Sequence, residues 1–268
     1  QAVAAHSQYN CLIYNVNEGV ATVTLNRPRK RNALNKEMWT ELILALRSAS
    51  RDDRVVVCVL TGSGDYFSSG NDLNNFIEAS KRGSNAADYL TFENVPLVKL
   101  LVDILIDFPK QLIAAVNGPA IGIAVTSLGL MDVVYASDTA TFLTPFTSLG
   151  QCAEACSSYT FPKNNGPSKA YEVLFFGRKL SAQDAKDCNL ISEVFPEDSF
   201  QREVQTRAVK FAALPRKTLQ AAKKLCRDGE REHLRDALKR ESDVLAVLTS
   251  SDECRDAIKN FFVRKSKM

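Results

Sequence analysis

Residues 111–137, QLIAAVNGPAIGIAVTSLGLMDVVYAS, decide the fold. No charged residue occurs between positions 111 and 131, so we expect this segment at the centre of the protein. Its apolar runs, separated by glycines and small residues, predict a strand, a glycine loop, a short apolar helix and a second strand.

The flanking sequence repeats this alternation of strand and helix. Residues 19–28 alternate as a strand that ends at Pro28, and Asn35 is placed to cap a helix over 36–52. Further predicted elements are a strand buried on both faces over 54–64, helices over 71–83 and 95–108, a strand over 140–145, helices over 168–177 and 181–190, a strand over 191–195, and several helices to the end. Short strand–helix units predict an α/β protein with a mainly parallel sheet covered by helices.

Composition limits the broad class. At 268 residues and 45% hydrophobic, the chain fits one α/β domain with an appended helical part as well as two small domains. A net charge of +3 is too small to argue for nucleic acid, and no apolar run reaches the ~18 residues of a membrane span. Seven scattered cysteines predict reduced thiols in an intracellular compartment. There is no secretory signal, and because the chain begins with Gln, its natural start can lie upstream.

Glu154 is the only charged residue between Asp138 and Lys163. A carboxylate in such apolar surroundings is poorly solvated, which raises its pKa toward neutral and suits it to carrying a proton. The two histidines, His6 and His233, lie in segments that do not suggest catalysis. Two other roles stay open for Glu154: capping a helix N-terminus, or pairing with a buried Lys or Arg.

Two glycine loops follow predicted buried strands, FSSGNDL at 67–73 and NGPAIGIA at 117–124. Glycines at such turns let main-chain N–H groups point outward, and a following helix N-terminus favours negative charge. Two such loops facing one cleft would form an oxyanion hole, although each alone is also explained as a tight turn. Neither loop fits a dinucleotide or P-loop motif.

Two further segments are rich in positive charge. RPRKRN at 27–32 holds four cations and no acid, which suits phosphate binding; a solvated turn or a weak nucleic-acid patch are alternatives, the latter disfavoured by the short length and missing aromatics. The end, Ser266-Lys267-Met268, is close to the tripeptide that peroxisomal import receptors bind, or is simply a basic tail on a helix.

Four ordered segments carry a family resemblance: NRPRKRNALN, FSSGNDL, LIAAVNGPAIG and DVVYASDTATF. Over about residues 10–265 the chain resembles the crotonase (enoyl-CoA hydratase/isomerase) superfamily. GNDL, TPFTSLGQCAEACSSYTFP and the SKM end are most similar to its peroxisomal Δ3,Δ2-enoyl-CoA isomerase branch. Vertebrate members of that branch carry an acyl-CoA-binding domain in front, which residues 1–268 do not include.

The resemblance implies an architecture. It predicts one continuous crotonase (ClpP-like) domain, with a spiral of ββα units over 1–200 and a C-terminal helical trimerisation region over 201–268. The assembly would be a homotrimer or a hexamer.

The resemblance also implies a site. The main-chain N–H groups of Asn71 and Ile123 would form the oxyanion hole. Residues expected to hold coenzyme A are Lys30, Asn32, Ala33, Ser68, Ser69, Gly70, Asn71, Asp72, Leu73 and Gly122. Thr126, Phe146 and Leu149, with Leu143 beside them, would line the acyl pocket.

The departures from the hydratases indicate the reaction. Hydratases carry two glutamates, and the matching positions here are Thr126 and Phe146. Water addition needs two such groups, whereas a double-bond shift needs one base and an oxyanion hole. The resemblance therefore implies that 3-enoyl-CoA, cis or trans, is isomerised to trans-2-enoyl-CoA in β-oxidation, with Glu154 as the shuttle base. Coenzyme A is part of the substrate, and no other cofactor or metal is expected.

Two alternative functions remain at this point. One is a non-catalytic acyl-CoA-binding module, and the other is a different crotonase reaction such as hydration or dienoyl-CoA isomerisation. The expected location is the peroxisome, reached through the terminal tripeptide, or the mitochondrion if an N-terminal targeting segment is missing. No nucleic-acid partner and no membrane span are expected.

Overall fold

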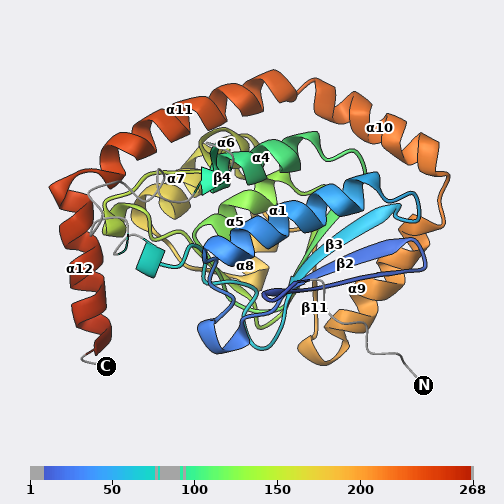
Figure 1. Cartoon of the computed structure of the whole chain (residues 1–268), viewed down its shortest axis with the longest axis horizontal. Coiled ribbons are helices and arrows are strands. Elements are labelled where there is room, and N and C mark those ends of the chain that lie inside the picture. The colour runs from blue at the N-terminus through green and yellow to red at the C-terminus, as the bar shows by residue number, and fades with distance from the viewer. Residues whose placement is uncertain (1–8, 76–77, 79–90, 93–94, 267–268) are drawn as a thin grey trace.

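The computed structural model describes residues 9–75, 78, 91–92 and 95–266 (Figure 1). Its centre is a six-stranded sheet in the order β1-β2-β3-β6-β8-β11. The strands are β1 Leu12–Asn17, β2 Val20–Leu25, β3 Val57–Gly62, β6 Gln111–Val116, β8 Val133–Ser137 and β11 Glu193–Phe195. All neighbours pair in parallel except β1 and β2. The predicted mainly parallel sheet is thus confirmed.

The antiparallel edge strand β1 was not among the predicted elements. It joins β2 through a tight turn in which Glu18 and Gly19 both have positive φ, 48° and 78°. Two successive positive φ values match the right-handed twist of a hairpin. The alternation of Leu12, Tyr14 and Val16 along β1 was the sequence signal for it.

Short strands lie outside the main sheet. β7 Ala120–Ile121, β9 Thr141–Leu143 and β10 Leu180–Ser181 form a second sheet in the order β10-β9-β7. The predicted strand over 140–145 therefore exists, but it pairs with the second glycine loop and not with β8. β4 Thr91–Phe92 and β5 Val95–Pro96 form a separate two-stranded pair.

Helices cover both faces of the main sheet. α1 Lys36–Arg51 and α4 Leu97–Asp107 lie on one face, where Trp39 and Leu46 are fully buried in the larger core. The Asn35 side chain accepts the Met38 N–H, so the predicted cap of α1 is confirmed. α9 Glu197–Ala212 covers the opposite face in a second core cluster. The sheet is buried from both sides, as the continuous apolar run of β3 predicted.

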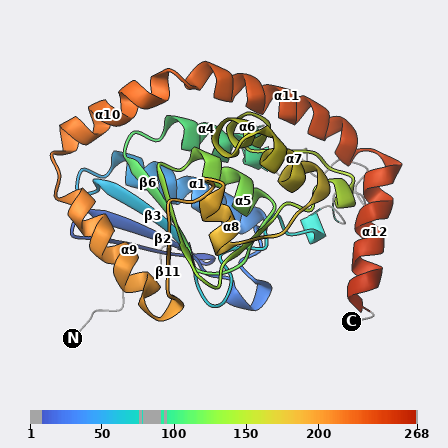
Figure 2. The ribbon, with the colours of Figure 1, turned by 180° about the vertical axis from the view of Figure 1, so that it is seen from behind.

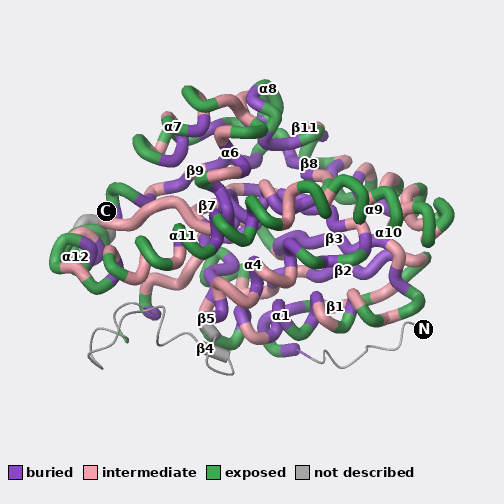
Figure 3. Tube along the Cα trace, turned by 90° about the horizontal axis from the view of Figure 1, so that it is seen from above, coloured by how far each residue is buried: buried purple, intermediate pink, exposed green. Residues whose placement is uncertain are grey.

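The remaining helices complete the chain. They are η1 Pro28–Lys30, α5 Ile123–Thr126, η2 Ser127–Leu130, η3 Thr147–Leu149, α6 Ser157–Asn165, α7 Pro167–Phe176, α8 Ala182–Asp187, α10 Arg216–Asp228, α11 Arg231–Thr249 and α12 Asp252–Ser266. α10, α11 and α12 form an arch around the edge of the core (Figures 1 and 2). Figure 3 shows buried backbone concentrated on the central strands and exposed positions on α9, α10 and α12.

Two predicted features fall wholly or partly outside the described residues. Most of the helix predicted over 71–83 lies outside the described residues. So do Lys267 and Met268 of the terminal tripeptide. Among the described helices, none combines the length and apolarity that crossing a membrane requires.

A buried lysine joins α1 to the sheet. Lys110 precedes β6 and is 1% exposed, and its Nζ donates to the carbonyl oxygens of Ala49 (2.7 Å) and Asp52 (2.6 Å) at the end of α1. Main-chain carbonyls at a helix C-terminus need such donors when water cannot reach them.

We therefore expect Lys110→Met to lower the free energy of unfolding by about 1–3 kcal/mol, because the two carbonyls lose their buried partner. Urea unfolding measures the change. Lys217→Met is the control, since Lys217 is exposed on α10. An equal effect in both variants would contradict a structural role for Lys110.

Candidate active site

The two predicted glycine loops lie side by side. Ser68 forms a bridge with Ala120, and the Ile121 N–H donates to the Ser68 carbonyl at 2.9 Å. Gly70 has φ 76°, and a Cβ added there would lie 2.4 Å from the Ile121 carbonyl oxygen. Only glycine permits this approach of two main chains. The contact brings Asn71 and Ile123, each one or two residues further along, to the same end of the sheet.

The N–H groups of Asn71 and Ile123 donate no hydrogen bond within the part of the chain that the structure describes. Leu34 pairs with the first loop through two main-chain hydrogen bonds. Its N–H donates to the Gly70 carbonyl (2.8 Å), and its carbonyl accepts the Asp72 N–H (3.1 Å). In this parallel bridge the Asn71 N–H points away from Leu34. Ile123 begins α5, where the first N–H groups of a helix have no partner inside the helix.

The two segments expected to hold coenzyme A are joined by main-chain and side-chain bonds. The Ser69 N–H donates to the Arg31 carbonyl (2.9 Å), and the Ser68 hydroxyl donates to the Asn32 carbonyl (2.8 Å). Ser68 and Asn32 are both buried, and the Asn32 amide donates to the Ser63 and Tyr66 carbonyls at 2.9 and 2.7 Å. These two side chains therefore set the path of the loops.

The cations of the basic cluster at 27–32 lie in two different environments, one inside the protein and one on its surface. Arg27 turns inward, where it donates to the Ala33 carbonyl and lies 3.5 Å from the Asp72 carboxylate. Arg29, Lys30 and Arg31 are exposed. Three exposed cations beside the first glycine loop form a surface suited to phosphates.

Phe146 lies against the second glycine loop. Its Cε1 is 4.0 Å from the position of a Cβ on Gly122, a residue whose φ of 62° and ψ of −126° favour glycine. The Phe146 carbonyl accepts the N–H groups of Leu149 (2.9 Å) and Gln151 (2.8 Å). This turn begins the segment that leads to Glu154.

Glu154 is half-buried, and no hydrogen bond or ion pair to its carboxylate occurs within the described residues. Loss of solvation, and secondly the negative charge of Glu241, raise the pKa of Glu154 to about 8. The predicted desolvation is thus present. Among the described residues, the Glu154 carboxylate neither caps a helix nor pairs with a buried cation.

The residues expected to line the acyl pocket lie on several elements around the two glycine loops. Thr126 is fully buried on α5, and its hydroxyl has no partner among the described residues. Leu149 packs with Ile258 of α12, and Leu73 of the first loop joins the same apolar cluster. The Leu143 carbonyl accepts the Gly122 N–H at 2.8 Å.

A small apolar cavity behind the loops was not anticipated. It has a volume of about 30 Å³ and is lined by Ser68, Ile123 and leucines of α1 and α4, among them Leu42 and Leu101. The spacing Leu42/Leu46 and Leu101/Leu105 marks the apolar faces of these helices, but only the fold places both faces beside Ile123. The cavity could receive a small apolar group.

A larger cavity, of about 460 Å³, lies between α6, α10 and α11 and contains none of the predicted site residues. Its charged side chains form ion pairs with one another. Lys223 and Arg227 both contact the Asp132 carboxylate, at 2.6 and 3.2 Å, and Lys163 pairs with Glu230. Cys226, an exposed free thiol, also lines this cavity.

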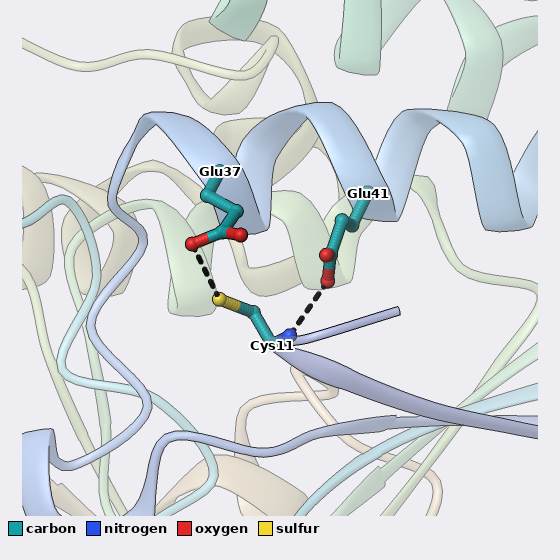
Figure 4. A group of neighbouring side chains, drawn as sticks. All are labelled: Cys11, Glu37 and Glu41. Atoms are coloured by element: carbon teal, nitrogen blue, oxygen red, sulfur yellow. Dashed lines mark hydrogen bonds between the residues drawn. The ribbon is translucent and has the colours of Figure 1, made fainter. Parts of the chain in front are cut away.

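Cys11, Glu37 and Glu41 lie close enough to share a metal ion (Figure 4). Hydrogen bonds account for their positions: Glu41 accepts the N–H groups of Asn10 and Cys11, both at 2.7 Å, and Glu37 accepts the Cys11 thiol. Burial and the two carboxylates raise the pKa of Cys11 to about 11, which disfavours the thiolate that a metal needs. The group fixes the start of β1 to α1.

His233 is exposed and stacks on Tyr159, with the ring centroids 5.4 Å apart, whereas His6 lies outside the described residues. All seven cysteines lie in the described part of the chain and are free thiols. Cys152, close to Glu154 in sequence, has its pKa raised to about 11, chiefly by burial and then by Glu154.

Comparison with known proteins assigns the family. The family model for enoyl-CoA hydratase/isomerase matches residues 15–267. The chain belongs to the enoyl-CoA hydratase/isomerase family. The predicted crotonase membership and α/β crotonase fold are confirmed. A crystal structure of an enoyl-CoA hydratase/isomerase from Pseudoalteromonas atlantica T6c is similar with a TM-score of 0.87 and 32% identity, covering 95% of this chain and 98% of that one.

Two curated relatives are more similar in sequence. Human enoyl-CoA delta isomerase 2 is 49% identical over 97% of this chain, and this chain spans 65% of its length. Mouse enoyl-CoA delta isomerase 3, peroxisomal, is 43% identical over 93% of this chain and 77% of that protein.

The close approach of the loops predicts the effect of Gly70→Ala. We expect a loss of both stability and acyl-CoA binding, because the new methyl group meets the Ile121 carbonyl and forces the loops apart. Gly166→Ala is the matched control: Gly166 has nearly the same φ, 77°, but nothing lies within 4 Å of its added Cβ. The control should lose only the ~1–3 kcal/mol that an alanine costs in a positive-φ extended conformation (φ 77°, ψ 149°). Urea unfolding and calorimetric titration with acyl-CoA measure both effects, and equal losses would contradict the steric argument.

The raised pKa of Glu154 predicts a dependence of stability on pH. The folded carboxyl has a pKa of about 8, against an ordinary value of 4.5, so between these values the folded state holds a proton that the unfolded state releases. Relative to Glu154→Gln, the wild-type protein should be stabilised at low pH and lose that advantage as the pH rises through about 8. Urea unfolding of both proteins from about pH 5 to pH 9 tests this, and a constant difference would contradict it.

Proposed function

We propose that the protein isomerises 3-enoyl-CoA, cis or trans, to trans-2-enoyl-CoA in the β-oxidation of unsaturated fatty acids. One observation carries the proposal. Two N–H groups without described acceptors, those of Asn71 and Ile123, lie on adjoining loops. The segment anchored beside them leads to one desolvated carboxylate, Glu154, which has no partner among the described residues. The similarity to enoyl-CoA delta isomerases supports the choice of reaction.

In this mechanism Glu154 acts as the single base. Its carboxylate removes a proton from C2 of the thioester, and the electrons move to the carbonyl oxygen as a dienolate. The Asn71 and Ile123 N–H groups stabilise that oxygen, a contribution worth about 2.7–4 kcal/mol for each donor. The Glu154 carboxylic acid then returns the proton to C4, so the double bond moves from C3–C4 to C2–C3 with no net gain or loss of atoms.

A base with a pKa of about 8 suits this reaction. A raised pKa increases the affinity of the carboxylate for the C2 proton and makes it a stronger base near neutral pH. The cost is that the carboxylate form is reached only at higher pH.

We further propose where the substrate binds. Lys30, exposed beside the first loop, would meet phosphates of coenzyme A, and main-chain groups of residues 68–73, with Ala33 and Gly122, would hold the rest near the thioester. The acyl chain would lie against Thr126, Phe146 and Leu149. The buried Asn32 and Ser68 side chains would act by holding the loops in position.

The residues at the hydratase positions favour isomerisation over water addition. Phe146 is 3% exposed and lies against Gly122, where a hydratase glutamate would activate water. Thr126 offers a hydroxyl where the second glutamate would stand. Neither side chain is an acid or base near neutral pH, and a dry apolar wall discourages hydration.

Assembly and location complete the proposal. Exposed apolar side chains on the C-terminal helices, such as Leu225 (81%) and Val247 (72%), fit a region over 201–268 that forms a homotrimer or hexamer. We propose a peroxisomal location, reached through Ser266-Lys267-Met268. The mouse relative is named as a peroxisomal protein, which supports this proposal.

The proposal predicts that Glu154→Gln lowers kcat for 3-enoyl-CoA by about 10²–10⁴-fold, since the base is lost. Binding of the CoA ester should persist, because the loops are unchanged. Formation of the 2-enoyl thioester is followed by its ultraviolet absorbance. Glu232→Gln, at an exposed position of α11, is the control.

Three outcomes decide between the alternatives. Turnover in Glu154→Gln equal to the wild type would refute the base assignment. No turnover in the wild-type protein, with CoA-ester binding intact, would indicate a non-catalytic module. Water addition as fast as isomerisation would indicate a hydratase.

A further inference from the structure

A buried glutamate of α11 contacts the turn that carries Glu154. Glu241 lies on α11, 6% exposed, and its two carboxylate oxygens each accept one main-chain N–H. The donors are Cys156, at 2.7 Å, and Ser158, at 2.8 Å. A helix distant in sequence therefore holds the residues that directly follow Glu154.

The turn needs such a partner because its backbone is strained. Ala155 and Cys156 have φ values of 55° and 62°, so two consecutive residues with a Cβ adopt the left-handed region. Each costs about 1–2 kcal/mol there. Such conformations persist only where the surrounding structure fixes them.

Glu241 also supplies the missing cap of α6. Cys156 occupies the N-cap position and provides no side-chain hydrogen bond to the helix. A carboxylate near the first N–H groups satisfies them and interacts favourably with the helix dipole. Here that carboxylate comes from α11, so the start of α6 depends on a tertiary contact.

Three further hydrogen bonds hold the chain at the strained residues. The Glu154 carbonyl accepts both the N–H of Ser157, at 3.1 Å, and its hydroxyl, at 2.7 Å. The Cys156 thiol donates to the Leu234 carbonyl, also on α11, at 3.2 Å. These bonds fix the main-chain position from which the Glu154 side chain extends.

We propose that Glu241 is a positioning residue of the active site, whose carboxylate holds the left-handed turn that presents Glu154 to the substrate. This inference rests on the proposed function, in which Glu154 is the base. Glu241 need not touch the substrate, because it acts through the main chain of residues 155–158.

The charge of Glu241 has a second effect. It is the charged group that raises the pKa of Glu154, after the larger effect of burial. The same carboxylate would therefore place the base and strengthen it. Replacing Glu241 with Gln removes the charge and one of the two N–H acceptors, whereas Asp keeps the charge on a shorter side chain.

Other titratable groups around the turn must be considered in a pH experiment. They are Cys152 and Cys156 in the turn itself, Arg240 on α11, Asp103 on α4, Arg227 on α10 and Cys254 on α12. The three thiols have raised pKa values, and burial also raises the pKa of Glu241, so Glu154 and Glu241 are the two groups whose ionisation the pH profile must follow.

The experiment measures kcat and KM for 3-enoyl-CoA across pH in Glu241→Gln and Glu241→Asp. We expect Glu241→Gln to lower kcat by about 10–10²-fold with little change in KM, as a small misplacement of a reacting group does. The midpoint of the acid limb should move to lower pH in this variant. Glu241→Asp should lower kcat but leave the midpoint near the wild-type value.

Glu41→Gln is the matched control. Glu41 is also a buried glutamate, 9% exposed, that accepts two main-chain N–H groups, but at β1 and away from Glu154. It should lose comparable stability in urea without a change of kcat or midpoint. This comparison separates positioning of the base from a general loss of stability.

The outcomes distinguish this inference from the proposed function. Wild-type kcat and midpoint in Glu241→Gln, or the same changes in Glu41→Gln, would overturn the inference. If Glu241→Gln does not fold, wild-type kcat in Glu241→Asp overturns it, and a lowered kcat with an unmoved midpoint supports it. Full turnover in Glu154→Gln would instead refute the base assignment itself.

Discussion

The contact between two main chains at Gly70 and Ile121 is the constraint on which the site depends. No side chain fits between them, because a Cβ on Gly70 would lie 2.4 Å from the Ile121 carbonyl oxygen. This contact sets the distance between the loop after β3 and the loop after β6, and with it the relative placement of the Asn71 and Ile123 N–H groups. The parallel pairing of β3 and β6 makes it possible, since parallel strands end at the same edge of a sheet.

The neighbouring bonds serve the same geometry. Asn32 and Ser68 satisfy carbonyls and N–H groups of the loops, and Leu34 adds a bridge to Asn71. Every one of these contacts is polar and largely buried, so each loop conformation is costly to leave. A rigid pair of N–H donors is what stabilisation of a developing oxyanion requires.

On the other side of the proposed site, burial works against stability. A half-buried carboxylate with no partner in the described part of the chain, followed by two residues with left-handed φ, lowers the stability of the fold. The two hydrogen bonds that Glu241 accepts from main-chain N–H groups offset part of this loss of stability. Such local strain and perturbed proton affinity, concentrated within five residues, are typical of functional sites.

The local elements and the chemical candidates could be predicted from short stretches of sequence. Apolar periodicity predicted α1 and α4, the continuous apolar run predicted the buried strand β3, and the uncharged surroundings of Glu154 predicted its raised pKa. These features depend on neighbours in the chain, so they are visible in a window of residues. The edge strand β1 was missed although its alternation was present.

The contacts between residues distant in sequence became known from the fold alone. It separated Arg27, turned inward to Asp72, from the exposed Lys30, and it placed Leu73 with Leu149 against α12. It also brought Glu241 to the turn after Glu154, across 85 residues from Cys156. No local pattern encodes such a pairing, because the free energy of a buried hydrogen bond depends on where the whole chain excludes water.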